Sequence, residues 1–163
     1  MLIKFISVII LSLCAWFFGK NYSDLLIEKI HIVEEYILFS KELKSAVYFS
    51  GKNVYEFFKN NKLKATENFC TFLINNKTIG IEKSIKKFKP INNDEKICVD
   101  FLYEPLVFIE NSSDTEVIAE LLNSASENLL SYKLQIQEEY KGRIKTAPSI
   151  TLICGLFIAL VLI

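Results

Sequence analysis

The chain has 163 residues, of which 51% are hydrophobic, and its 19 basic and 19 acidic side chains give no net charge. This apolar content exceeds what the core of a soluble domain of this size needs, so part of it is expected to face lipid. The composition argues against a disordered chain, a collagen-like repeat, a disulfide scaffold and an ordinary soluble enzyme.

An apolar segment opens the chain, and we expect residues 2–19 to form an N-terminal transmembrane helix. It ends in aromatic residues, Trp16 to Phe18, where a cleavable signal would have small residues. Aromatic side chains at this position are typical of a membrane interface. The segment is short for a span, and Lys4 would have to reach toward the near interface. Cleavage of the segment as a signal therefore stays open.

A helical repeat follows this first segment. Its positions alternate at intervals of four and three residues: Leu26, Ile30, Val33, Ile37, Ser40, Lys44 and Val47. This spacing is typical of a coiled-coil seam. It predicts a long helix that continues the first span and ends near Gly51, a residue that often stops helices.

Shorter helices are expected next, over residues 54–60, 67–75, 79–88 and 94–109. We expect Pro105 to kink or split the last of them. Ser113 and Asp114 can cap a second long helix, which repeats the 4-3 spacing from Ile118 to Tyr140 and leads into an uncharged apolar run. That run, residues 147–163, is expected to be a C-terminal transmembrane helix with Pro148 at its entrance.

These elements predict an all-α fold, since no stretch alternates with period two between hairpin turns. Two long helices that leave the same membrane face in opposite chain directions should lie antiparallel. We therefore expect a membrane-anchored helical bundle over residues 20–146, whose two long helices are continuous with the N- and C-terminal spans.

Cationic side chains near the spans predict the orientation of this bundle. Lys141, Arg143 and Lys145 stand just before the C-terminal span, whereas Lys4 alone lies on the other side of the membrane segments. Positively charged residues close to spans favour the cytoplasmic side. Residues 20–146 are therefore expected in the cytoplasm.

The middle of the chain carries separated charge. Residues 52–89 hold nine lysines and three glutamates, and residues 94–139 hold eleven acidic residues and two lysines. Solvated helix faces with some internal pairing explain this pattern, and so does a charged surface for a partner. For the second case, Lys83, Lys86 and Lys87 are the candidate docking residues. The phenylalanines of this region have the spacing of a helical core, so we expect no nucleic-acid binding.

Patterns that carry chemistry are not found in the sequence. His31 is the only histidine, Cys70 and Cys98 have no metal-ligand spacing, and no phosphate-binding or nucleophile motif occurs. We expect no catalytic residues, no metal and no cofactor. A membrane-bound enzyme whose site forms only within a complex is an alternative.

The order of the elements resembles one known family. The features are the segment Leu43 to Phe49, the Ser113-Asp114 helix start, the cationic stretch Lys141 to Lys145 and the terminal span around Gly155. Together they resemble the stage III sporulation protein AB family of endospore-forming Firmicutes.

This resemblance implies a non-catalytic platform whose cytoplasmic domain is similar to those of type II secretion system F proteins. It implies a place in the outer forespore membrane facing the mother cell, within a channel complex between the two cells. The implied partners are the stage III sporulation protein AA ATPase and other stage III sporulation membrane proteins, and homo-oligomerisation stays open. The alternative is an exported, envelope-side structural tether held by the C-terminal span.

Overall fold

A computed structural model describes the backbone of residues 2–50 and 53–162, and the side chains of residues 6–48 and 53–161. Contacts within the chain divide it into two units. We call residues 2–30 and 135–162 the two-helix unit, and residues 31–134 the bundle unit. The expected helix stop at Gly51, the side chain of Lys4 and the last residue, Ile163, lie outside the described part.

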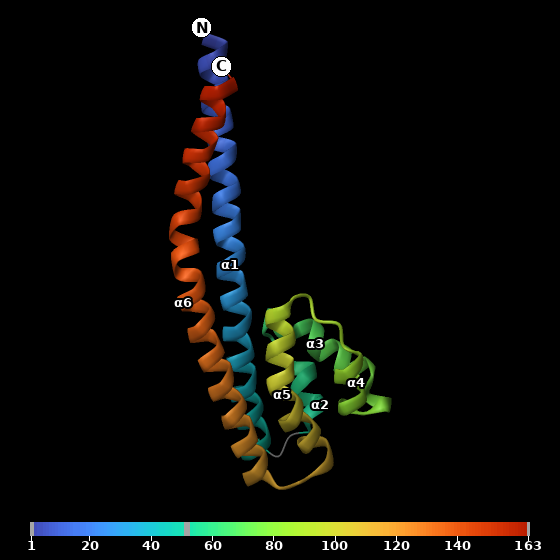
Figure 1. Cartoon of the computed structure of the whole chain (residues 1–163). Helices are drawn as coiled ribbons and strands as arrows, with labels where there is room; N and C mark the ends of the chain where they lie inside the picture. Colours follow the sequence, from blue (N-terminus) through green and yellow to red (C-terminus); the bar gives the residue numbers. More distant parts are fainter. Residues whose placement is uncertain (1, 51–52, 163) are drawn as a thin grey trace. The chain divides into compact units, whose positions relative to one another are not determined.

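The described residues form helices and contain no strand, which confirms the predicted all-α fold (Figure 1). The elements in chain order are α1 (Leu2–Ser50), α2 (Val54–Asn60), α3 (Lys64–Asn75), the 3-10 helix η1 (Lys77–Ile79), α4 (Ile81–Lys87), α5 (Asn93–Asn111) and α6 (Thr115–Leu162). The two long helices, α1 and α6, each run without a break from one unit into the other.

Both long helices are long and apolar enough to cross a membrane. In the most apolar stretch of each, only 17% and 11% of the residues are buried within the protein. The core helix of a soluble protein would be mostly buried, whereas exposed apolar side chains on a long helix are what a bilayer accommodates. These two helices indicate a membrane protein.

In the two-helix unit, α1 and α6 lie antiparallel (Figure 1), and they approach each other closely at glycines. A Cβ atom added at Gly155 would lie 2.6 Å from the Cβ of Ala15, and one added at Gly19 would lie 2.8 Å from the carbonyl oxygen of Ala147. Ala159 is fully buried in the same unit. Small residues let the backbones of membrane helices come close enough for extensive van der Waals contact.

Pro148 lies inside α6, and a residue of α1 compensates for the hydrogen bond that it cannot make. Proline has no N–H, so the carbonyl of Ile144, four residues earlier, loses its helical donor. The hydroxyl of Ser23 in α1 lies 3.0 Å from that carbonyl oxygen and 3.1 Å from the carbonyl oxygen of Gly19, so its one proton is shared between the two acceptors. Ser23 is buried, so this bond keeps a polar group satisfied where water is excluded.

The bundle unit has an aromatic core. Tyr36 and Phe39 of α1 are fully buried against Phe58 of α2 and Phe69 of α3, with the rings of Phe39 and Phe58 stacked at 6.2 Å. Phe88 extends the cluster, since its ring lies 5.1 Å from that of Phe69. Aromatic rings bury large areas and contribute further through such contacts. The expectation that the phenylalanines serve the core holds for Phe58 and Phe69.

The polar members of the α1 repeat contact α6 directly. Ser40 is fully buried and donates to the carbonyl oxygen of Leu122 at 3.0 Å. Lys44 is half-buried and its Nζ lies 2.8 Å from the side-chain oxygen of Asn123. The seam between the two long helices therefore continues through these positions by hydrogen bonds instead of apolar contact.

Two helix starts differ from the sequence prediction. α3 begins at Lys64 instead of residue 67, because a carboxylate from α1 accepts the N–H of Ala65. α4 begins at Ile81, because Gly80 adopts a φ of +85° that breaks the helix expected over residues 79–88.

The helix is not split at Pro105, since α5 runs through this residue. Proline inside a helix costs about 3 kcal/mol. Leu102 and Leu106 beside it are fully buried, and this burial offsets the loss. The bounds of α2 agree with the prediction, and so does the start of α6.

Candidate partner-docking surface

The three lysines predicted to bind a partner lie on or at the end of α4, which is held to the bundle unit at its start. Gly80 caps this helix, and the backbone N–H of Ile81 donates to Glu110 of α5 at 2.7 Å. The hydroxyl of Ser84 donates to the carbonyl of Gly80 at 2.6 Å. Ile81 and Ile85 are buried, so the opposite face of α4 is left to solvent.

The structure separates the roles of the three lysines on this exposed face. Lys86 forms an ion pair with Glu82 at 2.6 Å, and the Tyr103 hydroxyl donates to the same glutamate at 3.3 Å. The hydrogen bond between Lys86 and Glu82 lowers the pKa of Glu82 and raises the pKa of Lys86. Lys83 and Lys87 are exposed and lie four residues apart, so they point to the same side of the helix.

A hollow of about 380 Å³, which the sequence did not predict, lies next to the end of α4. Its lining residues are Asn68, Phe72, Lys87, Phe88, Lys89 and Ile91. Ile91, in the linker between α4 and α5, is 73% exposed. A second hollow of about 370 Å³ borders the same linker and includes Lys86, Lys96 and Asp100. The local sequence Lys89-Pro90-Ile91 signals a turn but not an exposed apolar edge.

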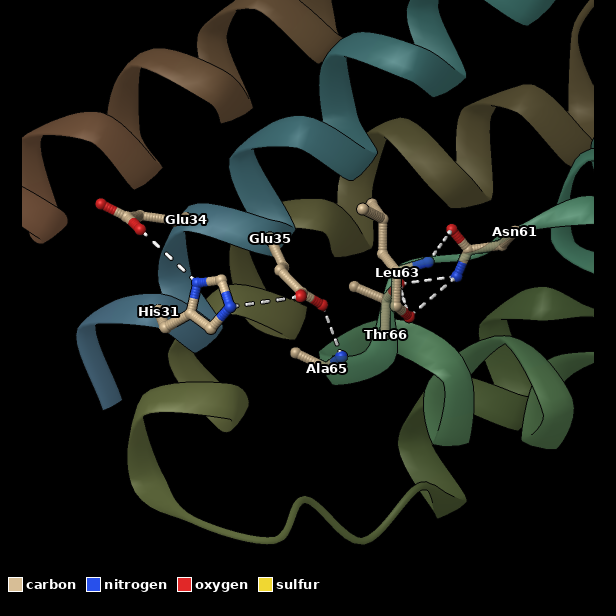
Figure 2. Close-up of polar contacts among 7 residues, drawn as sticks. All are labelled: His31, Glu34, Glu35, Asn61, Leu63, Ala65 and Thr66. Carbon is tan, nitrogen blue, oxygen red and sulfur yellow. Dashed lines mark hydrogen bonds and ion pairs between the residues drawn. The ribbon is translucent and has the colours of Figure 1, made fainter. Parts of the chain in front are cut away.

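Figure 2 shows a polar cluster around His31 on α1. The two imidazole nitrogens lie 3.6 Å from carboxylate oxygens of Glu34 and Glu35, and the histidine side chain is 65% exposed. Glu34 also pairs with Lys133 of α6 at 2.8 Å, whereas Glu35 accepts the backbone N–H of Ala65 at 2.6 Å. The cluster thus joins α1 to α6 and to the start of α3.

The two adjacent glutamates on α1 point to different elements, as their helical spacing predicts. Glu35 is only 12% exposed, and its carboxylate is held by the backbone N–H of Ala65. The hydrogen bond from Lys133 lowers the pKa of Glu34, with a smaller contribution from His31. Near the start of α3, the side-chain amide of Asn61 donates to the hydroxyl of Thr66 at 2.7 Å (Figure 2).

Several acidic residues of the second half are internal structural groups. Glu95 is 1% exposed and accepts hydrogen bonds from the Tyr36 hydroxyl at 3.2 Å and from the backbone N–H of Ile91 at 2.5 Å. Asp94 is also buried and accepts from Tyr132 at 2.6 Å. Burial and the nearby Glu95 carboxylate raise the pKa of Tyr36. These carboxylates hold α5 to α1 and α6, so they do not offer a solvated acidic face.

The cysteines of the bundle unit are buried. Cys70 and Cys98 are at most 2% exposed, and burial raises the pKa of the Cys70 thiol to about 12. Burial likewise raises the pKa of Cys98, with Asp94 adding to the effect. No group of three or more histidine, cysteine or carboxylate side chains suited to a metal ion occurs in the part of the chain that the structure describes.

A larger hollow of about 450 Å³ lies near the start of α2. There Lys77 stands 4.8 Å from the centre of the Tyr55 ring, and the Tyr55 hydroxyl donates to Glu110 at 3.1 Å. Burial and this carboxylate raise the pKa of Tyr55 to about 12. The polar side chains here bind one another and tie α2 to α5.

The cationic residues that precede the C-terminal span lie in the two-helix unit. Lys141, Arg143 and Lys145 are exposed on α6. Lys141 lies 3.7 Å from Glu138 and Arg143 lies 3.5 Å from Glu139, which are exposed helical pairs of small energetic value.

Comparison of the chain with protein-family models, curated proteins and solved structures gives no match. The described surface offers a basic helix face and an apolar hollow beside it, both on the bundle unit.

Proposed function

We propose that this chain is a non-catalytic platform, anchored in a membrane by α1 and α6, whose bundle unit docks a cytoplasmic partner through the basic face of α4. The observation that carries the proposal is the combination of two long apolar helices with one intervening helical unit that presents exposed lysines. The buried carboxylates of that unit are occupied by structural hydrogen bonds. The work of such a protein is to position a partner at a membrane.

The resemblance to the stage III sporulation protein AB family makes this proposal specific. The partner would be the stage III sporulation protein AA ATPase, and the site would be the outer forespore membrane, on its mother-cell side. The platform would pass force or position from the ATPase to other stage III sporulation membrane proteins. The competing proposal is an exported envelope tether held by the C-terminal span, which differs in the side of the membrane that the bundle unit occupies.

Labelling of a cysteine with membrane-impermeant maleimide-PEG distinguishes these two proposals. Cys70 and Cys98 are buried and serve as internal negative controls, so we introduce Ser124→Cys at an exposed position of α6. Cys14 and Cys154 are exposed and are replaced by serine. Labelling only after the membrane is permeabilised supports the cytoplasmic platform. Labelling in intact cells contradicts it and supports the tether.

Charge reversal tests the docking face. The change of Lys83, Lys86 and Lys87 to glutamate should abolish co-purification of the ATPase if the basic face of α4 is the binding surface. The matched control reverses Lys59, Lys62 and Lys64, which are exposed lysines of the same basic region away from α4. An equal loss in both variants would mean that only the general charge of the region matters, and unchanged recovery would exclude α4.

A further inference from the structure

The hollow beside the end of α4 has features that select one kind of ligand. Its biological role depends on the platform function proposed above. Its six lining residues combine three large apolar side chains, Phe72, Phe88 and Ile91, with two lysines, Lys87 and Lys89. None of the six is acidic. We propose that this hollow binds a protein segment in which a large apolar side chain is flanked by aspartate or glutamate.

The hollow is open to solvent and has room for a large apolar side chain of the partner together with its neighbours. Its volume is about 380 Å³, in the range of sites that bind small ligands. Phe72 and Phe88 are half-buried in the bundle unit, with their rings 5.5 Å apart, so their remaining exposed area faces a concave surface. An apolar side chain inserted there leaves water, and hot spots of protein interfaces have this form.

The charge at the rim determines which segment fits. Lys87 and Lys89 are both exposed and lie on either side of Phe88 in the sequence. Their ammonium groups attract carboxylates and raise the rate of association with an acidic partner. A basic or neutral segment gains nothing from them. The lysines therefore discriminate among partners that all offer an apolar side chain.

The linker that forms the hollow is already fixed before a partner binds. The backbone N–H of Phe88 donates to the carbonyls of Ser84 and Ile85, and the N–H of Ile91 donates to the buried carboxylate of Glu95. The other oxygen of Glu95 accepts from Tyr36 in the core. A surface held in this way loses little conformational entropy on binding.

An anionic bilayer is the other surface that exposed lysines and an exposed isoleucine could contact. A bilayer is broad and smooth, however, and cannot place a side chain in a hollow whose walls are aromatic rings. The concave form therefore favours a protein segment, and the test includes the bilayer as a separate outcome.

The test uses the full chain in mild detergent and a set of short fluorescent peptides. Each peptide has a central leucine, phenylalanine or tryptophan flanked by glutamates, and matched peptides carry lysines in place of the glutamates or alanine at the centre. Fluorescence anisotropy should show binding of at least one acidic apolar peptide. The matched lysine and alanine-centred peptides should bind about tenfold more weakly or not at all.

Variants of the hollow should then weaken binding of the acidic peptide. Lys87→Glu with Lys89→Glu, and Ile91→Ser alone, should each raise its dissociation constant by about tenfold or more. The matched control, Lys59→Glu with Lys62→Glu, should leave it unchanged. Circular dichroism checks that all variants are folded, as expected for changes at exposed positions.

Absence of binding by every acidic apolar peptide, or equal binding by the hollow and control variants, would overturn the proposal. A fluorescent dye attached to Ile91→Cys provides the lipid test. If its emission shifts to the blue in anionic but not in zwitterionic nanodiscs while no peptide binds, the surface contacts lipid and the proposal is overturned. The membrane orientation is measured separately. If the bundle unit is cytoplasmic but binds no peptide, the platform proposal stands and its docking face lies elsewhere. If the bundle unit binds the peptide but lies on the other side of the membrane, the platform proposal fails and the binding role of the hollow stands.

Discussion

The close approach of α1 and α6 in the two-helix unit predicts opposite effects for two glycine substitutions. A Cβ atom at Gly19 would lie 2.8 Å from the carbonyl oxygen of Ala147 and from the Cα atom of Pro148, and 2.1 Å from the Thr151 hydroxyl. At Gly142, in the same helix as these neighbours, a Cβ atom would meet nothing within 4 Å. Gly19→Ala should destabilise the helix pair, and Gly142→Ala should not.

The magnitude follows from the distances. The Thr151 side chain can rotate away, but backbone atoms at 2.8 Å must retreat to the ordinary contact distance of 3.4 Å or more. A gap of that size removes about a quarter to a half of the attractive energy of each affected van der Waals contact along the interface. Overpacking of this kind costs about 1–3 kcal/mol. Replacing glycine by alanine in a helix returns up to about 1 kcal/mol at either position, so Gly19→Ala should lose up to about 2 kcal/mol net and Gly142→Ala should be neutral or slightly stabilising.

Trp16 allows the assay to report on the two-helix unit alone, because it is the single tryptophan of the chain and lies in that unit. Its fluorescence is followed while the protein in mild detergent is titrated with sodium dodecyl sulfate. The midpoint for Gly19→Ala should fall below that of the unchanged protein, and the midpoint for Gly142→Ala should match or exceed it. Equal midpoints for the two variants would refute the close packing at Gly19.

Three further predictions use other contacts. Ser23→Ala removes the donor to the carbonyl of Ile144 and should lower the free energy of unfolding by about 0.6 kcal/mol in the same titration, an effect that Ser23→Thr should largely restore. The pKa of Glu34 is lowered mainly by the hydrogen bond from Lys133, so its contribution to stability is present above the ordinary value of 4.5 and is lost as the pH falls through the lower folded value. Chemical unfolding of Glu34→Gln between pH 3 and 6 should therefore show a weaker acid-induced loss, and an unchanged pH profile would count against the ion pair. Cys70, with a thiol pKa of about 12, should resist maleimide at pH 7 until the protein is denatured, and rapid labelling of the native protein would contradict its burial.

The sequence predicted those features of the fold that depend on local signals. Asn53 accepts the N–H of Tyr55 and starts α2 where the pattern placed it. Asp114 accepts the N–H groups of Glu116 and Val117 and starts α6 in the same way. Such caps act within three residues, so the neighbouring sequence contains all the information that they need.

Features that depend on contacts between distant residues were missed. The early start of α3 comes from the hydrogen bond between the N–H of Ala65 and Glu35, which lies thirty positions earlier. No local sequence pattern predicts this bond. The hollow at the end of α4 likewise requires α3 to present Phe72 beside Phe88. The charge pattern indicated a basic region, but only the packing shows that Lys86 is paired while Lys87 borders an apolar hollow.

The contacts of the two-helix unit also show what the N-terminal segment contributes to that unit. The α6 face around Gly155 and Ala159 is made of small side chains, which have little apolar surface to offer to lipid but let α1 approach closely. Removal of residues 2–19 would take away Ala15, which lies against Gly155, and Gly19, which lies against Ala147 and Pro148. A C-terminal span acting alone has no need of such a face, since larger apolar residues would fill the same space against lipid. The close contact within the two-helix unit therefore depends on small residues of both α1 and α6.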